Sequence, residues 1–161
     1  MIRIRAARAD ERGALEALQR RASLANEGDR AALLAHPDAI QLPQEQIAAG
    51  AVHVAEDAAG VVLGFAAVLP RGDKDAELDG LFVDPPAQRR GVGRALVARS
   101  VEIARAAGAR ALYVVGNPHA EVFYRACGFA VIGRAETEFG PGLSMRLDLA
   151  PTVGDWLRKA S

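Results

Sequence analysis

Hydrophobic residues recur along the chain either at every second position or at every third to fourth position, and these two periods separate predicted strands from predicted helices. Asp10 is expected to cap a first helix whose apolar stripe is formed by Ala14, Leu15, Leu18 and Ala22. Further helices are predicted over 30–35, after Pro43 as far as Gly50, over 91–107 and over 120–126. Strands are predicted over 2–5, 52–54, 61–68, 76–83, 111–115, 130–134 and 143–149.

The order of these elements predicts how the strands pair. Short loops join the strands 52–54, 61–68 and 76–83, which favours antiparallel pairing. The helix over 91–107 is long enough for a right-handed crossover to the strand 111–115, which is apolar on both faces as a buried parallel strand would be. We predict an α/β fold of the α+β type, with a mixed and mainly antiparallel sheet of about six to seven strands flanked by helices.

One strand breaks the two-residue period. Leu78 and Leu81 are three positions apart with Gly80 between them, and an extra residue in a strand re-aims the side chains that follow. We therefore predict a β-bulge at Asp79–Gly80.

Composition and charge narrow the class of protein. The chain has 161 residues, half of them hydrophobic, with 20 basic and 20 acidic residues, which suits one compact domain and argues against a nucleic-acid partner. Cys127 is the single cysteine, so an internal disulfide is excluded. The start of the chain lacks the features of a secretory signal, and no apolar run is long enough to cross a membrane. We expect a cytoplasmic protein that contacts neither nucleic acid nor membrane.

The segment Gln88–Gly93 (QRRGVG) joins a predicted strand to a predicted helix. Backbone N–H groups at a helix start have no partner inside the helix, and glycines let an anion approach them, while arginines add charge-assisted hydrogen bonds to phosphate. The residues that follow, Arg94 and Leu96, exclude a nucleotide P-loop and a dinucleotide fingerprint. On these residues alone, a phosphate-binding loop and a tight turn with solvated arginines both stay open.

Two phrases of the sequence occur in a fixed order. The loop Gln88–Gly93 follows Leu81–Pro85 (LFVDP), and Asn117–Phe129 (NPHAEVFYRACGF) has the pattern Asn-x-x-Ala-x-x-Phe-Tyr-x-x-x-Gly-Phe. Together they resemble the pyrophosphate loop and a second conserved phrase of the GNAT superfamily of acyl-CoA-dependent N-acyltransferases. The resemblance spans 2–149, so we assign 1–149 to a GNAT N-acetyltransferase domain and 150–161 to a C-terminal tail.

The resemblance implies transfer of an acetyl group from acetyl-CoA, the co-substrate, to a primary amine by direct attack in a ternary complex. It implies that the bulged strand splays from its parallel neighbour and pairs with the pantetheine arm. Tyr124 matches the position of a general acid near the coenzyme sulfur, and Asn117 matches a group at a strand end that hydrogen-bonds the coenzyme or a water. The residues implied to bind the coenzyme are Leu81, Phe82, Val83, Gln88, Arg89, Arg90, Gly91, Val92, Gly93, Arg94, Asn117 and Tyr124.

Two carboxylates on the bulged strand compete for the role of general base. Glu77 matches a position where many relatives carry an acid, and we rank it before Asp79. Solvated strand carboxylates and deprotonation by solvent stay open as alternatives. Glu136 and Glu138 precede the last strand, and with the other two they could form an acidic rim that attracts a cation.

The remaining reactive residues favour plain structural roles. His36, His53 and His119 are far apart in the sequence without a supporting cysteine cluster, so we expect no metal. We expect His53 on the exposed face of its strand, with a place in the lining of the pocket as the alternative. A non-catalytic acyl-CoA sensor, an enzyme with another acyl donor and a homodimer all stay open. The acceptor amine has no recognisable signature, although the segment 23–50 and the loop 136–142 are expected to shape its pocket.

Overall fold

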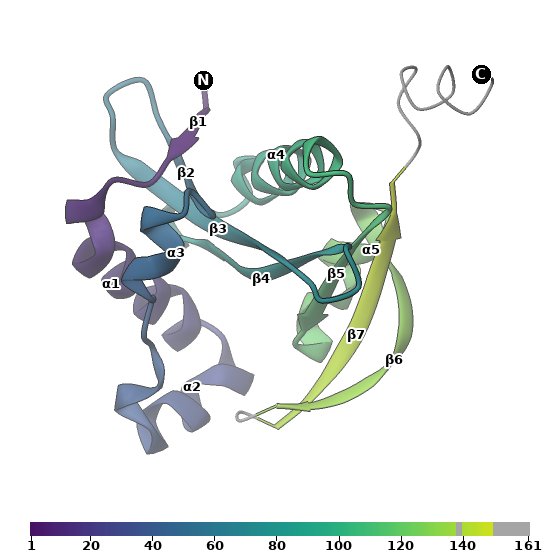
Figure 1. Cartoon of the computed structure of the whole chain (residues 1–161). Coiled ribbons are helices and arrows are strands. Elements are labelled where there is room, and N and C mark those ends of the chain that lie inside the picture. Colours follow the sequence, from purple (N-terminus) through teal and green to yellow (C-terminus); the bar gives the residue numbers. More distant parts are fainter. Residues whose placement is uncertain (138–139, 150–161) are drawn as a thin grey trace.

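The computed structural model describes residues 1–137 and 140–149 (Figure 1). Glu138 and the predicted tail 150–161 lie outside the described residues. The helices are α1 Arg12–Leu24, α2 Glu27–Ala35, α3 Gln44–Ala48, α4 Val92–Ala106 and α5 Glu121–Ala126, with short 3₁₀ turns η1 Ala9–Glu11, η2 Pro37–Ala39, η3 Pro85–Ala87 and η4 Pro118–Ala120. The strands are β1 Arg3–Ala6, β2 Val52–Glu56, β3 Val62–Pro70, β4 Ala76–Val83, β5 Ala111–Gly116, β6 Ala130–Thr137 and β7 Gly140–Asp148.

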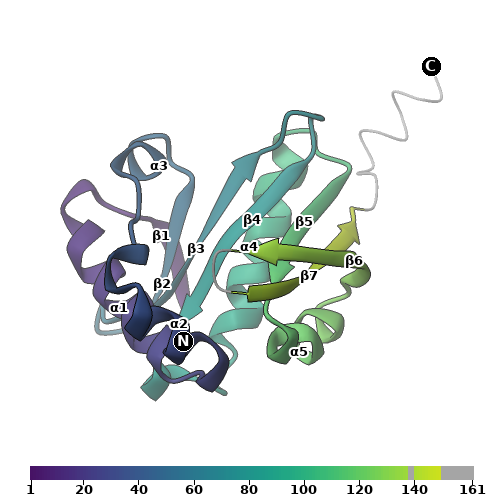
Figure 2. The same cartoon turned by 90° about the horizontal axis from the view of Figure 1, so that it is seen from below.

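The described strands form one seven-stranded sheet in the order β1-β2-β3-β4-β5-β7-β6 (Figure 2). β4 and β5 pair in parallel across the crossover through α4, and the other neighbouring pairs are antiparallel. The predicted fold class is therefore confirmed, and so is the predicted parallel connection.

Helices cover both faces of the sheet because β3 is apolar on both sides. Ala66 and Val68 pack with residues of α4 in one core cluster, whereas Phe65 and Ala67 pack with Leu15 and Leu18 of α1 in the other. Figure 1 shows α4 on one side of β2–β4 and α1 to α3 on the other. The predicted apolar stripe of α1 is confirmed for Leu15, Leu18 and Ala22, which are buried, and is wrong for Ala14, which is exposed.

The expectation that His53 is exposed is wrong. Its side chain on β2 is 3% exposed because α4 covers that face of the sheet, and its Nε2 lies 3.1 Å from Ser100 Oγ of α4. Ser100 Oγ also lies 2.8 Å from the Leu96 carbonyl, to which it can donate its hydrogen. His53 Nδ1 is buried without a hydrogen-bond partner among the described residues.

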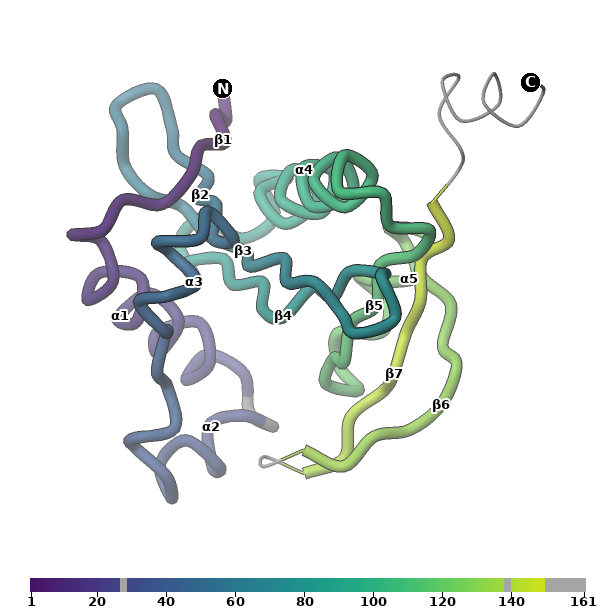
Figure 3. The backbone as a smooth tube through the Cα atoms, in the orientation of Figure 1, coloured from purple at the N-terminus to yellow at the C-terminus, as the bar shows by residue number. Residues whose placement is uncertain are grey.

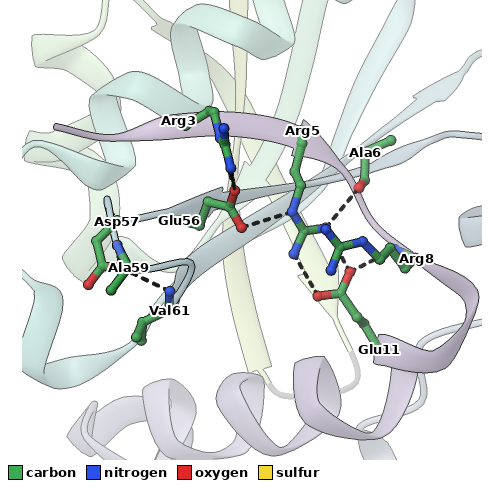
Figure 4. A network of polar contacts seen from close by, with 9 residues as sticks. All are labelled: Arg3, Arg5, Ala6, Arg8, Glu11, Glu56, Asp57, Ala59 and Val61. Carbon is green, nitrogen blue, oxygen red and sulfur yellow. Dashed lines mark hydrogen bonds and ion pairs between the residues drawn. The ribbon is translucent and has the colours of Figure 1, made fainter.

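The start of the chain is held by a polar network between β1, β2 and η1 (Figure 4). Glu56 accepts hydrogen bonds from Arg3 and Arg5, and Arg5 also donates to Glu11 at 2.8 Å. Asp10 was expected to cap α1, but it lies inside η1, and Glu11 instead accepts from the Arg8 N–H at 2.7 Å. The Arg5 guanidinium lowers the pKa of Glu11 to about 2.

The predicted bulge is confirmed and explains where the sheet opens. Ala67 pairs with Gly80 and Val68 with Leu78, so Asp79 is the extra residue of β4. Parallel pairing with β5 covers Ala76 to Leu78 and stops at the bulge. Beyond it, the two strands diverge toward their carboxyl ends (Figure 2).

Candidate active site

A cavity of about 670 Å³ lies where β4 and β5 diverge. It is lined by α1 and α2, by β4 from Asp79 onward, by the start of α4, and by the segment from the end of β5 to α5. The tube in Figure 3 shows α2 and the paired ends of β6 and β7 at the same end of the molecule. Of the two segments that we expect to shape an acceptor pocket, the segment 23–50 contributes Ser23, Asn26 and Asp29 to the cavity lining, whereas the described residues of the loop 136–142 do not line it.

The cavity gathers the predicted site residues, apart from Glu77 and Arg90, which do not line it. The roles of all these residues stay predictions, because their placement alone does not test them. Those that line the cavity are Leu81, Phe82, Val83, Gln88, Arg89, Gly91, Val92, Gly93, Arg94, Asn117 and Tyr124.

The start of α4 presents backbone N–H groups to the cavity. Gly91 has a left-handed backbone with φ of 80°, and its carbonyl accepts the first helical hydrogen bond, from Ala95 N–H at 3.1 Å. The N–H groups that precede Ala95 have no acceptor inside the helix. The first turn contains no acidic residue, and the side chains of Arg89 and Arg94 line the same cavity. This arrangement suits an anion.

Glycine is needed at the two glycine positions of the loop for different structural reasons. A Cβ on Gly91 would meet no atom within 4 Å, so the left-handed backbone is what requires glycine there. A Cβ on Gly93 would lie 3.0 Å from two ring atoms of Phe123. Close packing of α4 against α5 therefore also requires Gly93, a constraint that the sequence motif alone did not indicate.

The open edge of β4 offers backbone groups to the cavity. Asp84 N–H donates to the Leu63 carbonyl at 2.8 Å, which fixes the alternation of the β3–β4 ladder. By this alternation Phe82 directs its backbone groups to β3, while Leu81 and Val83 direct theirs to the edge that β5 has left. An extended chain with amide groups could pair with this edge.

Tyr124 closes the cavity on the side of α5. Its side chain is 7% exposed and lies edge-on to the rings of Phe123 and Phe129, and a Cβ on Gly116 would lie 3.1 Å from its ring. Burial raises the pKa of the phenol, so it carries its proton at neutral pH. In the part of the chain that the structure describes, the hydroxyl has no hydrogen-bond partner.

Asn117 makes a contact that the sequence did not suggest. Its side-chain amide nitrogen donates to both carboxylate oxygens of Asp29 on α2, at 2.7 and 2.8 Å. Asp29 lines the cavity with Ser23 and Asn26, and His119 lines it from η4. Ser23, Asn26 and Asp29 were not predicted as site residues because the segment 23–50 has a weak hydrophobic period.

The sequence matches the acetyltransferase (GNAT) family over residues 15–129, which include the loop, the bulged strand and Tyr124. The chain belongs to the GNAT family. No curated protein matches the sequence. The GNAT assignment agrees with the resemblance inferred from the two sequence phrases.

Solved GNAT-like structures share the fold. The PaiA N-acetyltransferase from Thermoplasma acidophilum, in complex with coenzyme A, has a TM-score of 0.72 and 17% identity over 92% of this chain and 99% of that chain. The ribosomal-protein-S18-alanine N-acetyltransferase from Escherichia coli has a TM-score of 0.68 and 20% identity over 94% and 96%. Nourseothricin acetyltransferase is 27% identical, with a TM-score of 0.57, but the match covers 62% of this chain and 65% of that chain.

The candidate bases of this GNAT chain are placed differently from one another. Asp79, the bulged residue, lines the cavity, whereas Glu77 does not and lies beside Tyr113 of β5 in the parallel register. Glu136 is exposed on β6 and is not part of the lining. Of the carboxylates near β4 named from the sequence, Asp79 is thus the one that the fold brings to the cavity.

Metal binding and membrane insertion were both considered for the described residues. Within residues 1–137 and 140–149, no group of three or more His, Cys, Asp or Glu side chains is arranged to hold a metal ion. Over the same residues, no helix combines the length and hydrophobicity needed to cross a membrane.

Proposed function

We propose that this GNAT protein is an N-acetyltransferase that moves the acetyl group of acetyl-CoA to a primary amine by direct attack in a ternary complex. The observation that carries the proposal is one continuous cavity that is lined by the N terminus of α4, the open edge of β4 and Tyr124. We also expect the protein to be cytoplasmic, and homodimer formation stays a prediction.

The residues present fit acetyl-CoA. The cavity volume lies within the roughly 300–1,000 Å³ usual for ligand pockets. The N–H groups at the start of α4, with Arg89 and Arg94, would hold the diphosphate, and the backbone of Leu81 and Val83 would pair with the pantetheine amides. Bound acetyl-CoA supplies the activated thioester.

The side chains of the cavity match the proton movements that such a transfer needs. An alkylammonium with a pKa of about 10 must lose a proton before its nitrogen can attack, and Asp79 lies where it could accept that proton, directly or through water. The thiolate that leaves gains from a proton donor, and Tyr124, which lines the cavity, keeps its proton at neutral pH. Glu77, the base ranked first from the sequence, would have to act through intervening water.

Release of free thiol from acetyl-CoA with a panel of primary amines tests the proposal. Turnover in the wild type is expected, and Tyr124→Phe should lower kcat about tenfold or more with nearly unchanged affinity for acetyl-CoA, because only the hydroxyl is removed. Tight acetyl-CoA binding without turnover for any amine would indicate a non-catalytic sensor instead. Faster turnover with propionyl-CoA or succinyl-CoA would indicate another acyl donor.

A further inference from the structure

A carboxylate on α2 lies in the cavity without a cationic partner. Asp29 accepts from the neutral amide of Asn117, and among the described residues no Lys or Arg forms an ion pair with it. The two oxygens of a carboxylate offer about four acceptor positions, so Asn117 orients the group and leaves acceptor capacity toward the cavity. The charge of Asp29 is therefore held in place and is not neutralised by a protein cation.

In the proposed function, the arginine side chains of the cavity lining bind acetyl-CoA and not the acceptor. Arg89 and Arg94 come from the loop at the start of α4, where the proposed function places the diphosphate. Asp29 instead comes from α2, which covers the face of the sheet opposite α4. Asp29 is half-buried in the first turn of α2, where the helix N terminus stabilises its charge in the free protein. A cationic group of the acceptor is the chemistry that an oriented carboxylate without a protein cation would bind.

The group that binds Asp29 and the nitrogen that reacts are assigned to different carboxylates. In the proposed function Asp79 on β4 accepts the proton of the reacting nitrogen, so this step does not need Asp29 on α2. A second positive group that keeps its charge throughout the reaction can stay paired with Asp29.

We propose that Asp29 is a specificity-determining residue that binds a second ammonium group of the acceptor, so that the preferred acceptors are diamines or longer polyamines. Asn117 is the positioning residue that orients the Asp29 carboxylate. This inference rests on the proposed function, since it names the acceptor class of the same site.

The experiment compares each diamine with the monoamine of equal length, putrescine with butylamine and cadaverine with pentylamine. The readout is kcat/KM from thiol release at saturating acetyl-CoA. The wild type should prefer each diamine by about tenfold or more, as expected for a charge-assisted hydrogen bond. Asp29→Asn keeps the shape and an acceptor for Asn117 but removes the charge, so the diamine KM should rise about tenfold while the monoamine KM stays the same. Asp29→Glu should restore part of the preference.

Asp38→Asn is the matched control, because it makes the same chemical change at an exposed residue of η2 that does not line the cavity. It should retain the wild-type preference. Circular dichroism and the acetyl-CoA KM show whether each variant is folded.

Four outcomes would overturn the inference: equal kcat/KM for diamine and monoamine in the wild type, an unchanged diamine preference in Asp29→Asn, an equal loss in Asp38→Asn, or a preference for monoamines. Each of these leaves the proposed function intact, because amines are still acetylated. Absence of thiol release with every amine would overturn the proposed function and, with it, this inference.

Discussion

Gly93 and Gly13 provide a matched pair of substitutions that isolates one packing contact of the active site. Each glycine is the second residue of its helix, in α4 and α1 respectively. A Cβ at Gly13 would meet no atom within 4 Å, whereas a Cβ at Gly93 would lie 3.0 Å from the Phe123 ring. Both alanine variants gain up to about 1 kcal/mol of helix propensity, but Gly93→Ala alone forces the ring to move.

The expected cost comes from the ring contacts that Phe123 would lose if it shifted. Phe123 packs edge-on against Tyr124 at 5.1 Å between centroids, and Tyr124 packs in the same way against Phe129 at 5.4 Å. Overpacking of this kind costs about 1–3 kcal/mol. Gly93→Ala should therefore be less stable than Gly13→Ala by about 1–3 kcal/mol in urea unfolding of the ligand-free protein.

The same displacement should weaken the binding of acetyl-CoA, since Gly93 and Phe123 both line the cavity. In a Phe123→Ala background the two glycine substitutions should become equivalent, because the clash is gone. Equal unfolding free energies for Gly93→Ala and Gly13→Ala in the wild-type background would refute the reasoning.

Other properties can be tested independently. Arg94→Ala should weaken acetyl-CoA binding about ten- to hundredfold in calorimetry, by loss of a charge-assisted hydrogen bond to phosphate, whereas Arg105→Ala at the other end of α4 should not; equal effects would contradict the loop assignment. Burial lowers the pKa of His53, so the unfolded chain binds more protons than the folded chain, and the unfolding free energy should fall as the pH drops below about 6.5. In urea titrations at several pH values, His53→Leu should show a smaller fall than the wild type, and an equally steep fall would contradict this prediction. Arg5 lowers the pKa of Glu11 to about 2, so the unfolding free energy should fall further between about pH 4.5 and about pH 2. Glu11→Gln should remove this further fall, and an unchanged fall in the variant would contradict the pairing of Arg5 with Glu11.

Most of the fold could be predicted from the sequence, because the hydrophobic periods that identify strands and helices are local patterns. The two-residue period of 76–83 and its break at Asp79–Gly80 predicted both the strand and its bulge, and the apolar strand 111–115 predicted the parallel pair. The loop before α4 was predictable for the same reason, since its glycines and arginines are contiguous.

The contacts that the sequence did not predict join residues far apart in the chain. Asp29 and Asn117 are separated by 88 positions, and neither local period nor composition brings them together. The burial of His53 depends on which face of β2 the helix α4 covers, which the alternation of one strand does not specify. Phosphate approach is the one role that the sequence predicts for Gly93, because its neighbour Phe123 lies on another helix.

A crystal structure with coenzyme A bound would test most directly whether the N terminus of α4 holds the diphosphate and directs the thioester into the space between β4 and β5. We expect the diphosphate on the N–H groups of Gly91 to Arg94, the pantetheine amides on Leu81 and Val83, and the sulfur beside the Tyr124 hydroxyl. A diphosphate bound away from this loop, or a pantetheine arm that does not follow β4, would contradict the proposed site.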